Sequence, residues 1–116
     1  MGNERDEIIE KFAQLNLLVQ NLYKQRKFGD RSEEFRLIFN EFRANMLFFL
    51  QQSYIGIRSE PIVNEKIISH LTNSIKNLED MKEIAQEYKQ NNLVGFINSI
   101  ITYLNEIKQR LIRLVK

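Results

Sequence analysis

Apolar residues recur along this chain at the spacing of an α-helix, and this spacing constrains the fold more than any other feature. The C-terminal quarter keeps a strict heptad, with alternating steps of four and three residues. Its members are Leu93, Ile97, Ile100, Leu104, Ile107, Leu111 and Leu114. Side chains at this spacing share one face of a helix, so we predict a helix here with one buried stripe.

Three further segments show the same period. Their apolar stripes are Ile8, Phe12, Leu15, Val19 and Leu22; Phe35, Phe39, Phe42, Met46 and Phe49; and Ile67, Leu71, Ile75, Leu78, Met81, Ala85 and Tyr88. Gly29, Pro61 and the Asn91–Asn92 pair interrupt the pattern, as helix-ending or helix-starting residues do. We therefore predict helices over residues 4–28, 32–54, 60–90 and 92–116.

Four helices of similar length with short connections favour antiparallel neighbours. The predicted fold is an all-α, antiparallel, up-down-up-down four-helix bundle, with residues 1–116 as a single domain. The chain has only 4 glycines and 1 proline. This scarcity disfavours all-β and Rossmann-type folds, which use both residues at turns.

A weak internal echo suggests an alternative description of the bundle as two related helical hairpins. The tripeptide YKQ occurs at 23–25 and again at 88–90, and at the same offset FNEFR (39–43) aligns with LNEIK (104–108). Helical patterning alone also produces such echoes, so both explanations stay open.

The residue inventory argues against catalysis and against metal binding. There is no cysteine and a single histidine, His70. This excludes disulfides and thiolate metal sites, and no Glu-x-x-His pair of the kind that builds di-iron sites in bundles is present. No glycine-rich phosphate loop, nucleophile elbow or HExxH motif occurs. We predict a non-enzymatic protein with no cofactor and no metal, in which His70 is a structural residue.

The uncharged stretch ANMLFFLQQSYIGI, residues 44–57, is the most unusual segment. It is too short for a membrane span, which needs about 20 apolar residues. Residues 46–50 are all large and apolar, and a helix turns such a run through a full circle, so about two of them must leave the core. We predict a partner-binding surface with Leu47, Phe48, Leu50 and Tyr54 as anchors. The alternative is that residues 53–58 or the first helix cover these side chains.

Basic residues gather at two places, although the overall balance of 17 basic to 15 acidic residues is nearly even. The first cluster surrounds the first turn: Tyr23, Lys24, Arg26, Lys27 and Arg31. It predicts, as the alternative function, phosphate contacts with base stacking on Tyr23. The second cluster, Lys108, Arg110, Arg113 and Lys116, is expected near Glu4, Asp6, Glu7 and Glu10. Simple neutralisation by neighbouring acids, including Glu79, Asp80, Glu83 and Glu87 for the first cluster, is the competing interpretation.

These observations favour a small, non-enzymatic module that binds a protein partner, or a second copy of itself as a homodimer, through its second helix. The alternative is a nucleic-acid-binding bundle, such as an accessory domain of a replication or mobile-element protein. An immunity-type or chaperone-type bundle is a third reading that depends on fold analogy alone. The acidic stretch NERDE before the first apolar residues is the wrong charge for a secretory signal, which favours a cytoplasmic location.

Overall fold

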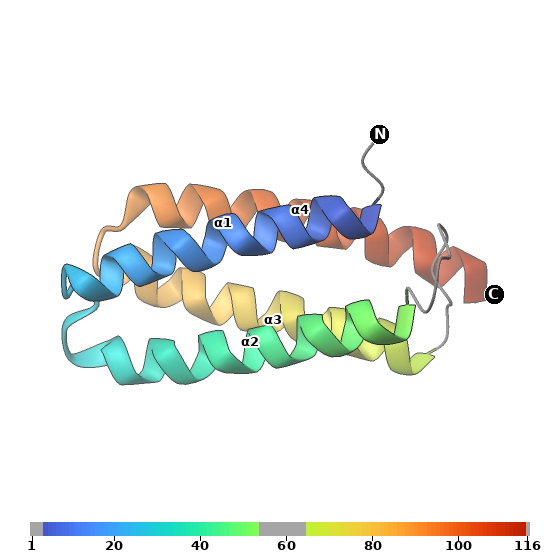
Figure 1. Ribbon diagram of the computed structural model, residues 1–116, viewed down its shortest axis with the longest axis horizontal. Helices are drawn as coiled ribbons and strands as arrows, with labels where there is room; N and C mark the ends of the chain where they lie inside the picture. Colours follow the sequence, from blue (N-terminus) through green and yellow to red (C-terminus); the bar gives the residue numbers. More distant parts are fainter. Residues whose placement is uncertain (1–3, 54–64, 116) are drawn as a thin grey trace.

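Four antiparallel α-helices make up the described chain. The computed structural model describes residues 4–53 and 65–115. Its elements are α1 (Glu4–Lys24), the short 3-10 helix η1 (Gly29–Arg31), α2 (Ser32–Ser53), α3 (Glu65–Glu87) and α4 (Asn91–Val115). The α1–α2 and α3–α4 connections lie at one end of the molecule, and the start of α1 and the end of α4 lie toward the other (Figure 1). This confirms the all-α four-helix bundle, and no strand occurs in residues 4–53 and 65–115.

The predicted apolar stripes form the core. All five stripe residues of α2, from Phe35 to Phe49, are at most 2% exposed. The α4 heptad is buried from Leu93 to Leu111, but Leu114 is 64% exposed. There α4 extends past the other helices (Figure 1). The core therefore contains one side chain from nearly every turn of each helix, which is the packing expected of a globular bundle.

The four helices do not pack equally closely against one another. α2 packs closely along α3, α3 along α4, and α1 more loosely along α4. A hydrogen bond from the Asn45 side-chain amide to the Asn77 side-chain oxygen, 2.8 Å long, links α2 to α3. Between α1 and α2 the backbones stay further apart, and the stacked rings of Phe12 and Phe42, 5.5 Å between centroids, bridge the two helices.

Two helices end earlier than predicted, through the same backbone motif. α1 ends at Lys24 instead of residue 28, and α3 ends at Glu87 instead of residue 90. In each case a basic residue adopts a left-handed conformation two residues later: Arg26 has φ 55° and Lys89 has φ 56°. The next amide then bonds five residues back, from Lys27 to Leu22 and from Gln90 to Ala85, which is the Schellman arrangement.

The other predicted ends differ by one residue or fall outside the described residues. α2 ends at Ser53 and α4 begins at Asn91, one residue from the predicted 54 and 92. Asn91 is thus the first residue of α4, and the left-handed residue between α3 and α4 is Lys89. The predicted start of the third helix, residues 60–64, lies outside the described residues.

The echoed tripeptides do not share a local structure. Tyr23 and Lys24 are the last two residues of α1, whereas Tyr88 and Lys89 lie in the turn after α3. The two Schellman turns are 63 residues apart, while the echo has an offset of 65, so the structural and sequence repeats are out of step. This mismatch gives the description as two related hairpins no support from backbone geometry.

Candidate functional site

Residues 46–50 divide between the core and the surface. Met46 and Phe49 are buried, Leu50 is half-buried, and Leu47 and Phe48 are 55% and 49% exposed. Two large apolar side chains of this run therefore project from the bundle, as the helical geometry of the run predicts. The exposed side chains of Leu47 and Phe48 are therefore available to a partner, whereas those of Met46 and Phe49 are not.

Leu47 and Leu50 lie in a groove between α1 and α2. Its volume is about 560 Å³. We call it the α1/α2 groove, and its lining residues are Ile9, Phe12, Ala13 and Asn16 of α1 and Asn40, Arg43, Ala44, Leu47 and Leu50 of α2. The groove exists because the two backbones stand apart where α1 and α2 face each other. The volume lies within the range of roughly 300–1,000 Å³ typical of ligand-binding sites.

The groove contains polar groups that the rest of the described chain does not satisfy. The Arg43 side chain is exposed, and its guanidinium carbon lies 5.8 Å from the centre of the Phe39 ring. No carboxylate in residues 4–53 and 65–115 forms an ion pair with it. Across the groove the side-chain oxygen of Asn16 is buried and accepts no hydrogen bond. A buried acceptor without a donor costs about 1–3 kcal/mol, and this oxygen is closed to a ligand in the groove.

Phe48 lies on the opposite flank of α2 and does not line the α1/α2 groove. Its ring stacks on His70 of α3, with centroids 5.4 Å apart and planes inclined by 21°. His70 is half-buried, and its Nε2 atom is buried without a hydrogen-bond partner. Tyr54, the fourth predicted anchor, lies outside the described residues. The structure therefore brings together two of the four predicted anchors, Leu47 and Leu50, and separates Phe48 from them.

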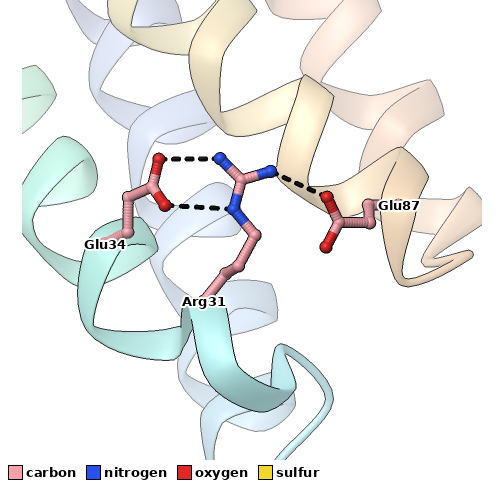
Figure 2. A network of polar contacts seen from close by, with 3 residues as sticks. All are labelled: Arg31, Glu34 and Glu87. Atoms are coloured by element: carbon pink, nitrogen blue, oxygen red, sulfur yellow. Dashed lines mark hydrogen bonds and ion pairs between the residues drawn. The ribbon is translucent and has the colours of Figure 1, made fainter.

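Arg31, one of the five residues of the predicted nucleic-acid site, is engaged within the protein (Figure 2). Its guanidinium donates to both carboxylate oxygens of Glu34, at 3.0 and 2.7 Å, and to Glu87 at 2.8 Å. The Arg31 hydrogen bonds hold the pKa of the Glu34 carboxyl below its ordinary value. Glu87 ends α3, Arg31 ends η1 and Glu34 lies in the first turn of α2, so this cluster connects α3 with the start of α2 at the turn end of the bundle.

Tyr23 also belongs to the interior of the bundle. Its ring packs edge-on against Phe28 and Phe35, with centroid distances of 5.5 and 6.0 Å. The phenol oxygen is buried without a partner, and burial raises the pKa of Tyr23 to about 12. Of the predicted nucleic-acid site, Lys24, Arg26 and Lys27 remain exposed, and none of them forms an ion pair within the described part of the chain.

One residue of the second basic cluster, Arg110, contacts the acidic start of α1, and Lys116 lies outside the described residues. Arg110 of α4 forms an ion pair with Glu4. One turn away, the Tyr103 hydroxyl donates to Glu7 at 3.0 Å, and Lys11 lies 5.0 Å from the centre of the Tyr103 ring. Burial and the Glu7 hydrogen bond raise the pKa of Tyr103. These contacts attach α1 to α4, on the side of α1 away from the groove.

Two negative findings apply to the described residues. No helix in residues 4–53 and 65–115 combines the length and the apolar character needed to cross a bilayer. Within the same ranges no group of three or more His, Asp or Glu side chains is arranged to hold a metal ion.

The contribution of α1 to the groove could not be read from its own sequence. Ile9, Ala13 and Asn16 recur at steps of four and three, beside the buried stripe of α1, and this second stripe is the signal that points to another occupied face. An alanine, an asparagine and a single isoleucine are common on solvated helix surfaces, so this second stripe indicates a groove only once α2 faces it.

Comparison with known proteins adds no assignment. No protein-family description matches this chain, and no curated protein or solved structure is significantly similar to it.

Proposed function

We propose that this protein is a non-enzymatic binding module that engages a protein partner through the surface formed by α1 and α2. The observation that supports the proposal is the α1/α2 groove itself, which is mostly apolar and is bordered by the exposed side chains of Leu47 and Ile9. Monomeric proteins seldom leave contiguous apolar surface uncovered unless a partner covers it. A cytoplasmic location, expected from the sequence, is part of the proposal.

Site-specific photo-crosslinking tests the proposal. A photoreactive amino acid placed at Leu47 is expected to trap a specific protein in cells of the source organism, whereas the same group at Asn105, on the outer surface of α4, should not. Capture of the same proteins from both positions, or of none from Leu47, would refute the proposal. If the purified protein crosslinks to itself from Leu47, the partner is a second copy of this chain.

A pair of glutamate substitutions then separates the groove from the rest of the exposed face of α2. Leu47→Glu is expected to weaken binding of the trapped partner at least tenfold, because it places a charge in the apolar groove. Phe48→Glu lies on the α3 side of α2 and reports whether the partner extends beyond the groove. Both side chains are about half exposed, so both variants are expected to fold.

The second candidate function is nucleic-acid binding at the turn end of the bundle. It is supported by Lys24, Arg26 and Lys27, which are exposed and form no ion pair with the residues that the structure describes, although Tyr23 and Arg31 have partners within the protein. Titration with labelled single- and double-stranded DNA at two salt concentrations tests it. Phosphate contacts predict binding that weakens as salt rises and that fails when the three cations are replaced by glutamine. No binding at low salt eliminates this candidate.

A further inference from the structure

We infer that the occupant of the α1/α2 groove is an amphipathic α-helix that presents an acidic side chain to Arg43. This inference depends on the proposed function and specifies the chemistry of the partner. It follows from the shape of the groove, the secondary structure of its walls and the cation Arg43 on one wall.

The groove has the dimensions of a short helical segment. Its lining spans residues 9–16 of α1 and 40–50 of α2. At 1.5 Å per residue these segments are about 10 and 15 Å long, or two to three helical turns. The small side chains of Ala13 and Ala44 face this space from opposite walls and allow a third helix to approach closely. A helix lying along the groove fills it with side chains at positions i, i+3, i+4 and i+7.

Both walls are helices, and this argues against an extended peptide. The backbone amides and carbonyls within α1 and α2 bond to one another and offer nothing to a strand. An extended segment buried in a mostly apolar groove would leave its own backbone groups without partners, at a cost of several kcal/mol. A helix satisfies those groups internally. A second copy placed face to face presents an identical concave surface, which leaves both grooves unfilled.

Charge complementarity specifies one residue of the occupant. Arg43 is a cation on the groove wall with no ion pair in the described part of the chain, and the nearby Phe39 ring does not neutralise it. An apolar helix docked without an acid would partly desolvate this guanidinium and leave it unpaired, which is unfavourable. A glutamate or aspartate on the occupant forms a charge-assisted hydrogen bond there instead.

Selection from a displayed library of ~18-residue helical peptides tests the inference. The apolar positions i, i+3, i+4 and i+7 are fixed and all other positions are randomised. Selection on the wild-type protein is expected to enrich an acid at one of the randomised positions. Selection on Arg43→Glu is expected to replace that acid with Lys or Arg. Arg113→Glu, an exposed charge reversal on α4, is the matched control and should leave the enriched acid unchanged.

Binding measurements on the enriched peptides complete the test. Arg43→Glu and Leu47→Glu are each expected to weaken the binding of peptides selected on the wild-type protein at least tenfold. When the acid of such a peptide is replaced by lysine, most of the affinity for Arg43→Glu should return. The inference is overturned if wild type and Arg43→Glu select the same charges, if no helical peptide binds, or if Leu47→Glu has no effect. A specific photo-crosslink from Leu47 alongside any of these results would leave the proposed function standing and reject only the helical occupant.

Discussion

At the scale of the residue, Gly29 occupies a position where any side chain would be strained and would press against Tyr88. Its φ is +48°, and a Cβ atom built there would lie 2.7 Å from the Tyr88 ring. Gly29 therefore permits both the left-handed turn before α2 and the close approach of the α3–α4 connection. Gly95, in the first turns of α4, has ordinary helical surroundings, and nothing lies within 4 Å of its virtual Cβ.

The two glycines make a matched pair of alanine substitutions. Gly29→Ala is expected to lower the free energy of unfolding by about 1–3 kcal/mol, because it adds backbone strain and a clash. Gly95→Ala is expected to raise it by roughly 0.5–1 kcal/mol, because alanine has the higher helix propensity. Urea denaturation of both variants measures the two changes. Equal effects of the same sign would contradict this account of the turn.

The raised pKa of Tyr23 predicts that the folded protein loses stability at alkaline pH. Its pKa of about 12 in the folded protein exceeds the ordinary value of 10.0. A raised pKa stabilises the fold below the ordinary pKa, and this contribution is lost as the pH rises toward 12. The stability of wild type relative to Tyr23→Phe is therefore expected to fall by on the order of 1–2 kcal/mol across that interval.

The Tyr23→Phe comparison has a second outcome near neutral pH. There the variant should be at least as stable as wild type, since it removes a buried hydroxyl that has no partner. Thermal denaturation at neutral pH and at several alkaline pH values measures both effects. A difference between the two proteins that does not change with pH would show that the Tyr23 hydroxyl is solvated in the folded state.

At the scale of the element, Arg31 connects the start of α2 with the end of α3. Arg31→Gln removes both ion pairs at once and is expected to lower the Tm by roughly 2–5 °C at neutral pH. The control is Arg36→Gln, which removes only the pair with Glu33 inside α2 and should have a smaller effect. A larger loss in the control would show that the bond between the helices contributes nothing.

The effect of Arg31 is expected to depend on pH in a defined direction. The pKa of Glu34 is lowered by Arg31, so the associated stability is present above the ordinary glutamate pKa of about 4.3 and is lost as the pH falls through the lowered value. The Tm difference between wild type and Arg31→Gln should therefore shrink in acid. A difference that persists well below that pKa would assign the effect to packing of the Arg31 side chain instead.

At the scale of the whole molecule, α1 is the least integrated helix. It has three buried residues, Ile8, Leu15 and Val19, whereas α3 has eight, and it packs loosely against α4 with the groove on its other side. Local opening is favoured where few apolar contacts must be broken. Partner binding in the groove would add contacts to this helix in particular, which links its stability to occupancy.

Native-state hydrogen exchange tests this distribution of stability. Amides in the middle of α1 are expected to exchange at least tenfold faster than amides in the middle of α3. Saturation with a peptide that binds the groove should slow exchange in α1 more than in α4. Equal protection of α1 and α3 would show that the bundle opens only as a single cooperative unit.

The sequence determined the local features of this protein. The period of the apolar residues predicted four helices, the buried stripes and the exposure of two side chains among residues 46–50. Helix ends were predicted less well. Arg26 and Lys89 adopt the left-handed conformation that usually indicates glycine, so neither residue could be recognised from the sequence as a helix end.

Only the tertiary structure decided which exposed residues meet. Leu47 and Phe48 are neighbours in sequence, yet one lines the groove with Ile9 and the other stacks on His70. The period of the apolar residues shows which face of a helix is buried, because that period is set by the 3.6-residue turn of the helix. It does not show which face of another helix lies opposite. The separation of α1 from α2, the groove it leaves and the pairing of Arg31 with Glu87 depend on all four helices packing together, and no single segment encodes them.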